Sequence, residues 1–266
     1  MKSMSERLKI PSIMGPCSVH SYRQLSMTAG ALNHGSVPDL LSVRANLKKP
    51  RTGDEWTGLG EQGVPIVQQV KRETNCRVSM EATTARDLEY MLRVADDLWL
   101  GSRQNPNNTM EIADALRGVR LGMFLVKNPY APDEKAWIGA IEVLKRRLHP
   151  SVRVVALFRG FCERTRVNGA QGWRNNPDLE IVKRVSVATG VDAGIDLAHL
   201  LGDAQLIMDY VKTHPLSRIW KLVMLEVDAQ RNLARTDKKQ TLTPDQAKAV
   251  ICDLRQDSVE IGLGII

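Results

Sequence analysis

The alternation of short apolar runs with longer amphipathic segments is the feature that most limits the folds open to this chain. Eight runs carry the apolar and β-branched residues typical of buried strands, and segments with helical periodicity lie between them. Strands that alternate with helices form parallel sheets with right-handed crossovers. Eight such units in 266 residues predict an α/β protein of the (β/α)8 TIM-barrel type. A doubly wound open sheet is the alternative.

The expected elements cover most of the chain. Strands are predicted at Ile10–Met14, Leu40–Ala45, Arg77–Glu81, Asp97–Gly101, Leu121–Val126, Val152–Phe158, Val191–Asp196 and Lys221–Glu226. Helices are predicted at Ser21–Leu32, Gly63–Thr74, Ala85–Val94, Asp133–Leu148, Leu179–Thr189, Gly202–Thr213 and Asp245–Arg255. The longest expected loop runs from Cys162 to Asp178, and a loop of that length is often functional. We expect one barrel domain over residues 1–266, with no separate regulatory domain.

Composition excludes several classes of protein. No apolar run approaches the roughly 20 residues that a membrane helix needs, and the polar start lacks the apolar centre of a signal peptide. We therefore expect a cytoplasmic protein that does not associate with membranes. The four cysteines are far apart and form no CxxC pair, which argues against a disulfide framework or an all-cysteine zinc site.

The net charge of +7 has three explanations. A plainly basic surface is one, a nucleic-acid interface is the second, and a cleft for acidic small molecules is the third. The basic clusters are short, and no zinc-finger, RRM or homeodomain pattern accompanies them. We expect no nucleic-acid partner.

Polar or metal-binding residues follow the expected strands. In chain order they are Cys17, Arg44 with Lys49, Arg51 and Thr52, Glu81, Arg103, Lys127, Arg159, Asp196 with His199, and Glu226. The carboxyl ends of barrel strands meet at one rim, and that rim carries the active site in barrel enzymes. The sequence therefore predicts a single functional site at this rim.

Two chemical sets are present at the predicted rim. The cations are Arg44, Lys49, Arg51, Arg103, Lys127 and Arg159. Cations that converge in one cleft repel each other unless anions neutralise them, so phosphate and carboxylate are the natural guests. The second set, Cys17, His199, Glu226 and Asp237, offers a thiolate, an imidazole and two carboxylates. Such a mixed set suits a divalent metal ion of borderline softness.

Each member of the second set also has an ordinary structural explanation. A lone cysteine such as Cys17 is more often a buried core thiol, and a lone His199 is more often a structural histidine. Glu226 could be a salt-bridge partner, and Asp237 could be solvated surface. Their shared placement after strands favours the functional interpretation.

Short motifs occur in order from about Met14 to Pro244. They are Gly15-Pro16-Cys17-Ser18, Lys49-Pro50-Arg51-Thr52, Gly58-Leu59-Gly60, Trp99-Leu100-Gly101-Ser102-Arg103, Val126-Lys127-Asn128-Pro129, Arg159-Gly160-Phe161, Arg174-Asn175, Asp196 with His199, Glu226, and Asp237 with Gln240. With these motifs the chain resembles the 3-deoxy-7-phosphoheptulonate (DAHP) synthases. The resemblance is to the type whose barrel also occurs fused to chorismate mutase.

The resemblance implies a role for each matched residue. Cys17, His199, Glu226 and Asp237 match the family's metal ligands, and the ion would be Mn, Fe, Co or Zn. Arg103, Lys127, Arg159 and Arg44 match cations that bind phosphoenolpyruvate. Arg51 and Thr52 match residues that hold the phosphorylated aldose, and Lys49 matches a lysine between the two substrates. Lys49, Asp196 and Glu81 are the expected catalytic residues, with Glu81 positioning a water.

The implied activity is that of a transferase of the shikimate pathway, which supplies aromatic amino acid biosynthesis. It joins phosphoenolpyruvate to erythrose 4-phosphate with release of phosphate. A homodimer or homotetramer is implied. We expect weak feedback inhibition unless a separate regulatory partner, such as a chorismate mutase, supplies it. A synthase for a different phosphosugar aldehyde, or a non-catalytic homologue, are the alternatives.

Several positions depart from the family pattern. Leu197 and Ala198 precede His199 where relatives have Pro and Ser, and Val227 and Asp228 follow Glu226 where Ser and His are common. Phe158 stands before Arg159, and Asn46-Leu47-Lys48 replaces a small-apolar-aromatic run. These departures leave the identity of the aldehyde open.

Overall fold

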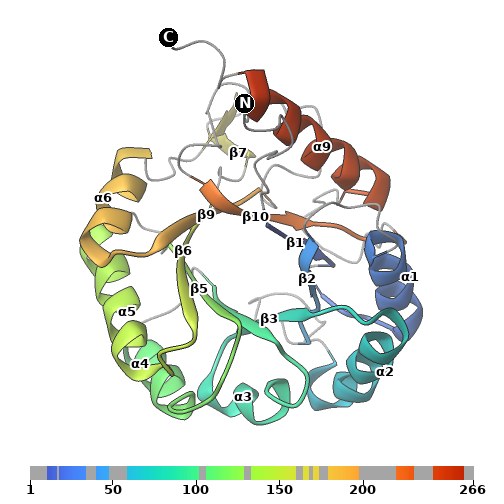
Figure 1. Ribbon diagram of the computed structural model, residues 1–266, viewed down its shortest axis with the longest axis horizontal. Helices are drawn as coiled ribbons and strands as arrows, with labels where there is room; N and C mark the ends of the chain where they lie inside the picture. Colours follow the sequence, from blue (N-terminus) through green and yellow to red (C-terminus); the bar gives the residue numbers. More distant parts are fainter. Residues whose placement is uncertain are drawn as a thin grey trace, which may run out of the picture.

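A closed barrel of eight parallel strands forms the centre of the computed structural model (Figure 1). The structure describes residues 11–16, 18–33, 40–47, 59–101, 106–128, 133–159, 164–167, 170–173, 179–197, 220–230 and 242–260. The barrel strands are β1 (Ser12–Gly15), β2 (Leu40–Arg44), β3 (Val78–Ala82), β4 (Asp97–Leu100), β5 (Met123–Lys127), β6 (Arg153–Arg159), β9 (Asp192–Asp196) and β10 (Trp220–Glu226). They follow one another around the ring, and β10 closes it against β1. The predicted TIM-barrel fold is confirmed, and the open sheet is excluded.

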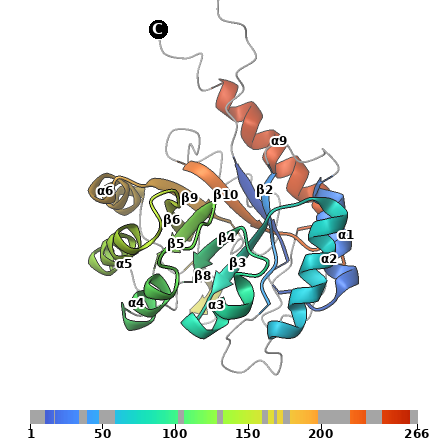
Figure 2. The same cartoon turned by 60° about the horizontal axis from the view of Figure 1, so that its bottom comes forward.

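Helices surround the strands as an outer layer (Figures 1 and 2). They are α1 (Tyr22–Asn33), the short 3-10 helix η1 (Gly60–Gly63), α2 (Val64–Thr74), α3 (Ala85–Met91), α4 (Pro106–Ala115), α5 (Glu134–Arg147), α6 (Leu179–Thr189) and α9 (Pro244–Glu260). No helix in the described part of the chain is both long and apolar enough to cross a membrane.

Local sequence signals set several helix ends. The Thr84 side chain accepts a hydrogen bond from the Asp87 backbone N–H and caps α3, and Asp133 caps α5 through the Ala136 N–H. The last turn of α5 carries the basic run Lys145-Arg146-Arg147, where cations stabilise the helix dipole. This run therefore has a structural explanation that needs no nucleic-acid partner.

Alternating side chains divide the core into two layers. One small cluster fills the inside of the barrel and consists of Ile13, Trp99, Met123, Leu125, Val155, Leu157, Leu222 and Met224. The larger cluster packs the outer strand faces against the helices, and Phe124, Val126, Ile195 and Val223 belong to it. Because strand side chains alternate between two faces, every second residue of a strand points into the barrel.

Two predictions about the elements need correction. The expected loop Cys162–Asp178 contains an antiparallel pair of strands, β7 (Arg164–Val167) and β8 (Ala170–Trp173). The turn residues Asn168-Gly169 join these strands, and Asn-Gly between two runs is a hairpin signal. Helix α4 was not predicted, because Pro106-Asn107-Asn108 is typical of a turn, although proline is also favoured at the first helical position. The predicted helix Gly202–Thr213 lies outside the described residues.

Candidate functional site at the carboxyl ends of the strands

Five predicted site residues lie on the inward face of the barrel strands, near their carboxyl ends. Met123 and Leu125 point into the barrel, so Lys127 continues the same face of β5. Leu222 and Met224 place Glu226 of β10 in the same way. The outward packing of Val43, Met80 and Ile195 leaves the inward face to Arg44, Glu81 and Asp196.

Lys127 of β5 and Asp196 of β9 form a buried ion pair past the intervening strand β6. The Lys127 ammonium donates to the Asp196 carboxylate, and the two side chains are 6% and 0% exposed. Arg159 is the register partner of Asp196 on the neighbouring strand, so β5, β6 and β9 bring Lys127, Arg159 and Asp196 to one part of the rim. A buried ion pair is costly to break because the remaining charge stays desolvated.

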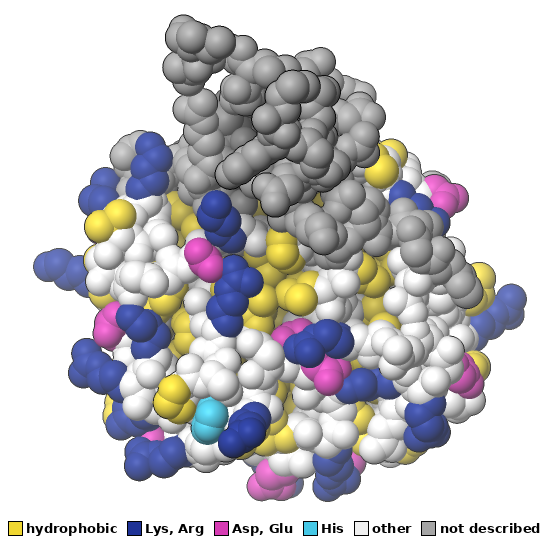
Figure 3. Space-filling view, viewed as in Figure 1, with side chains coloured by type: hydrophobic (Ala, Val, Ile, Leu, Met, Phe, Trp, Pro, Cys, Tyr) yellow, Lys and Arg dark blue, Asp and Glu magenta, His cyan; other side chains and the backbone are white. Residues whose placement is uncertain are grey.

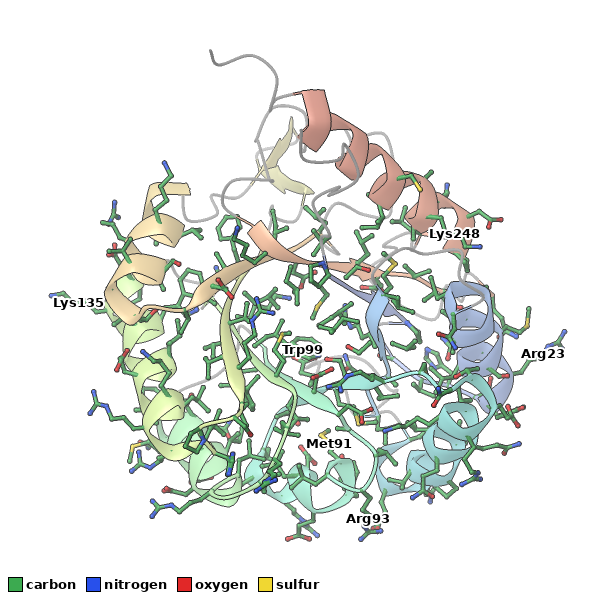
Figure 4. All side chains as sticks on the ribbon, in the orientation of Figure 1. Arg23, Met91, Arg93, Trp99, Lys135 and Lys248 are labelled. Carbon is green, nitrogen blue, oxygen red and sulfur yellow. The ribbon has the colours of Figure 1, made fainter. Side chains whose placement is uncertain are left out.

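Arg44 reaches the same interior from β2, which β3 and β4 separate from β5. Its guanidinium lies 4.9 Å from the centroid of the Trp99 ring, and the Lys127 ammonium lies 5.4 Å from that centroid. Arg44 and Lys127 are both nearly fully buried. Figure 4 shows Trp99 near the middle of the barrel, whereas the labelled Arg23, Lys135 and Lys248 lie on the outer helices. Two of the predicted cations thus converge above one aromatic ring.

Gly15 allows β1 to pass directly against β2 next to Arg44. A Cβ atom at Gly15 would lie 2.4 Å from the Arg44 carbonyl oxygen and 2.8 Å from its nitrogen. Both distances are shorter than any real contact allows, so only glycine fits. The Gly-Pro-Cys-Ser motif therefore begins with a residue that the backbone geometry requires.

Glu81 extends from β3 toward the end of β4. Its backbone N–H donates to the side-chain oxygen of the buried Asn46 at 2.8 Å. A Cβ atom at Gly101 would lie 2.1 Å from a Glu81 carboxylate oxygen, so the carboxylate occupies the space that this glycine leaves open. Glu81 is half-buried and stands beside the strand that leads to Arg103.

Chain segments next to three of the four predicted metal ligands meet at the end of β10. Glu226 is the register partner of Gly15, and the Val227 N–H donates to the Gly15 carbonyl at 2.9 Å. The Asp228 N–H donates to the Leu242 carbonyl at 3.0 Å. Gly15 precedes Cys17 by two residues, and Leu242 follows Asp237 by five. A buried Glu226 carboxylate at this junction fits a divalent ion with mixed ligands.

The remaining predicted site residues are not described by the structure. They are Cys17, Lys49, Arg51, Thr52, Arg103, His199 and Asp237, and only the backbone of Arg159 is described. The described residues include Glu226 alone of the four predicted metal ligands, and they contain no group of three or more His, Cys, Asp or Glu side chains arranged for a metal. The ligand set therefore stays a prediction.

Three of the departures from the family pattern lie outside the barrel interior. Phe158, Leu197 and Val227 all belong to the core cluster between the strands and the helices. Their side chains therefore fill the outer layer and do not line the substrate site. Ala198 lies outside the described residues.

The fourth departure, Asp228, is part of a buried polar network that the sequence analysis did not find. The Gln24 amide of α1 donates to the Asp228 carboxylate at 2.6 Å and to the Ser18 carbonyl at 3.2 Å. The Thr28 hydroxyl oxygen accepts the Ala229 N–H at 3.0 Å. The network ties the segments after β1 and β10 to α1. Its signal, polar Gln24 and Thr28 on one face of α1, is easily mistaken for solvated surface.

Part of the chain matches a known protein family. Residues 6–117, which run from before β1 to just beyond α4, match the DAHP synthetase I family. This part of the chain contains Arg44, Glu81 and Trp99, so the family match includes half of the barrel ring and three inward-facing residues of the site.

Relatives of the family extend the similarity over nearly the whole chain. A phospho-2-dehydro-3-deoxyheptonate aldolase of Thermotoga maritima is 24% identical over 259 residues, which cover 95% of this chain and 71% of the relative. The crystal structure of the phospho-2-dehydro-3-deoxyheptonate aldolase (DAHP synthase) from Thermotoga maritima superposes with a TM-score of 0.74 at 21% identity, over 95% of this chain and 70% of that one.

A truncated form of 3-deoxy-D-arabino-heptulosonate 7-phosphate synthase from Thermotoga maritima has a similar fold as well. It superposes with a TM-score of 0.72 at 19% identity, and the match covers 95% of this chain and 88% of that one. At these identities the two solved structures establish the barrel fold, which agrees with the strand order of this chain.

Proposed function

We propose that this chain condenses phosphoenolpyruvate with erythrose 4-phosphate to give 3-deoxy-7-phosphoheptulonate and phosphate, as a transferase of the shikimate pathway. The observation that carries the proposal is the buried, inward-facing set of Arg44, Lys127, Asp196 and Glu226 at the carboxyl ends of the strands. The match of residues 6–117 to the DAHP synthetase I family supports the reaction, and this set supplies a cationic pocket for a doubly charged phosphate and a carboxylate next to it.

The cations hold phosphoenolpyruvate in this proposal. Lys127 and Arg44 both present donors next to the Trp99 ring, and Arg159 is in register with Asp196 on the strand beside Lys127. Arg103 would complete the anion site. Asp196 balances the charge of Lys127 before substrate arrives and holds the ammonium in place. Orientation of two bound reactants removes much of the entropic cost of joining them.

The aldehyde site is assigned to Lys49, Arg51 and Thr52 on the segment after β2. Lys49 would donate a proton to the alkoxide that forms at the aldehyde oxygen, and Glu81 would orient the water that attacks C2 of phosphoenolpyruvate. The new carbon–carbon bond joins C3 of phosphoenolpyruvate to the aldehyde carbon, and phosphate leaves from C2 after water adds there. Cys17, His199, Glu226 and Asp237 would hold a Mn, Fe, Co or Zn ion, which supplies Lewis-acid polarisation of the aldehyde carbonyl.

The proposal is tested by phosphate release with manganese present. Release should need both substrates, should stop with EDTA, and should be absent in Cys17→Ala. A panel of four- and five-carbon aldose phosphates should show erythrose 4-phosphate as the best substrate. A better rate with another aldehyde would favour the synthase for a different phosphosugar. Absence of release with every aldehyde, in folded and metal-loaded protein, would favour a non-catalytic homologue.

We also propose an oligomeric state and a cellular location for the protein. A homodimer or homotetramer and a cytoplasmic location follow from the family resemblance and the composition, and a separate regulatory partner such as a chorismate mutase stays a prediction. On the face that Figure 3 shows, the described Lys and Arg side chains are spread over the centre and the edge of the molecule. The absence of a nucleic-acid partner stays a prediction.

A further inference from the structure

Trp99 lies inside the barrel at the level just below the cations. The side chain is 2% exposed and belongs to the small interior cluster with Leu125 and Leu157. On β4 it is the register partner of Glu81 on one side and of Leu125 on the other. Lys127 stands two residues beyond Leu125, so the indole lies one step deeper in the barrel than the ammonium.

The indole contacts two cations of the site at once. Arg44 and Lys127 approach the ring centroid at 4.9 Å and 5.4 Å, so the two cationic groups are no further apart than the sum of these distances. A cation over the face of tryptophan is attracted by the electron-rich π system, most strongly where water is excluded. Because both cations are nearly fully buried, their mutual repulsion is poorly screened, and an aromatic face offsets part of it.

Hydrogen bonding by the indole N–H does not explain why position 99 is a tryptophan. The Trp99 Nε1 atom has no hydrogen-bond partner among the described residues. Trp137, which is 1% exposed on α5, instead donates its Nε1–H to the Val126 carbonyl at 2.9 Å. A buried indole normally finds such a partner. At position 99 the indole therefore contributes its volume and its π face, and Arg44 and Lys127 lie next to this ring.

We propose that Trp99 is a positioning residue of the phosphoenolpyruvate site, which sets the separation of Arg44 and Lys127 and excludes water beneath them. This inference rests on the proposed function, since the anion that the two cations share is taken to be phosphoenolpyruvate. Trp99 acts through the cations and not on the reacting atoms. Its loss should therefore weaken phosphoenolpyruvate binding and leave the aldehyde site unchanged.

Binding of phosphoenolpyruvate to metal-free protein, measured by isothermal titration calorimetry, is the direct test. Trp99→Leu, which removes the π face, should raise Kd about tenfold, and Trp99→Phe, which keeps an aromatic face, should raise it only about threefold. Trp137→Phe is the matched control, because Trp137 is equally buried but belongs to the outer core layer between the strands and the helices, and its Kd should equal that of the wild type. In turnover, KM for phosphoenolpyruvate should rise in Trp99→Leu while KM for the aldehyde stays constant.

A second measurement separates the π face from packing and avoids any folding defect. Fluorinated tryptophans placed at position 99 alone keep the ring shape and progressively weaken its electron-rich face. The Kd for phosphoenolpyruvate should rise with each added fluorine. A flat series, equal losses in Trp99→Phe and Trp99→Leu, or wild-type affinity in folded Trp99→Leu would overturn the inference. If the wild type itself fails to bind phosphoenolpyruvate, the proposed function fails, and the two failures are thereby distinguished.

Discussion

The pair formed by Lys127 and Asp196 links the binding chemistry of the site to the stability of the barrel. Both side chains are almost completely removed from water. Their proximity neutralises the interior while the site is empty of substrate, and a bound anion would compete with Asp196 for the ammonium. If Lys127 binds phosphoenolpyruvate as proposed, the same pair makes the affinity for this substrate and the free energy of unfolding depend on one another.

Replacement of Lys127 should show this double role. Lys127→Met keeps the volume but leaves Asp196 buried without its cation, so the free energy of unfolding should fall by about 3 kcal/mol. The matched control is Arg93→Met. Arg93 pairs with Glu61 at 2.8 Å on the surface, and exposed pairs contribute less than about 1 kcal/mol. Urea unfolding measures both variants, and equally small changes would contradict the account.

Asp97, at the opposite end of the barrel, predicts a pH effect. Burial raises the pKa of Asp97 above its ordinary value of 3.8, while the hydrogen bond and charge of Arg77 oppose the rise. In the pH range between the unfolded-state pKa and the folded-state pKa, the native state binds more protons than the unfolded state does. The contribution of Asp97 to the free energy of unfolding therefore falls as pH rises through this range. The asparagine of Asp97→Asn cannot ionise, so this variant does not show that pH-dependent loss of stability.

The wild type should therefore become less stable relative to Asp97→Asn as pH rises from below 3.8 through the raised pKa. Urea unfolding of both proteins over a pH series gives the difference, which removes the contribution of the other carboxyl groups. A difference that grows in the opposite direction would mean that Arg77 lowers the pKa more than burial raises it.

At the scale of the elements, the close approach of β1 and β2 requires the glycine at position 15, whereas helix α5 does not require the glycine at position 139. Gly15→Ala should force the two strands apart next to Arg44, because its Cβ would clash with backbone atoms, and should cost about 3 kcal/mol of stability. Gly139 lies within α5 with open space around it, so Gly139→Ala should gain about 0.5–1 kcal/mol from helix propensity. Thermal unfolding would test both, and a tolerated Gly15→Ala would refute the close approach of the strands.

Strong local patterns made most elements predictable from the sequence. The eight barrel strands lie where the apolar runs indicated, within about two residues at each end. The hairpin β7–β8 was missed because its strands, Arg-Thr-Arg-Val and Ala-Gln-Gly-Trp, lack a continuous apolar run. Helix α4 was missed because proline and asparagine at a helix start resemble a turn.

The candidate site was predictable only in part, because sequence gives order along the chain but not contacts across the barrel. Alternation along the strands places Lys127, Asp196 and Glu226 on the inward face. No spacing in the sequence indicates that Arg44 and Lys127 meet over Trp99, since these residues come from three strands. The hydrogen bond between Gln24 and Asp228 spans 204 positions and was unpredictable for the same reason.

For the whole molecule, the barrel explains how a basic protein can present a compact anion site. The apolar interior cluster fills the barrel, and the inward-facing Arg44, Lys127, Asp196 and Glu226 lie beyond it, at the carboxyl ends of the strands. In the sequence, Cys17, Lys49, Arg103 and His199 each follow a strand that ends at this level. Phosphoenolpyruvate bound to Lys127 and Arg44 would thus meet residues from around the ring.

Mass-spectrometric identification of the product formed from phosphoenolpyruvate and erythrose 4-phosphate tests the central claim most directly. The metal-loaded protein should form a seven-carbon keto-acid phosphate that contains every carbon of both substrates, with one phosphate released per product. Lys127→Met, shown to be folded, should form at most a small fraction of it. A folded, metal-loaded wild type that leaves both substrates unchanged would contradict the account.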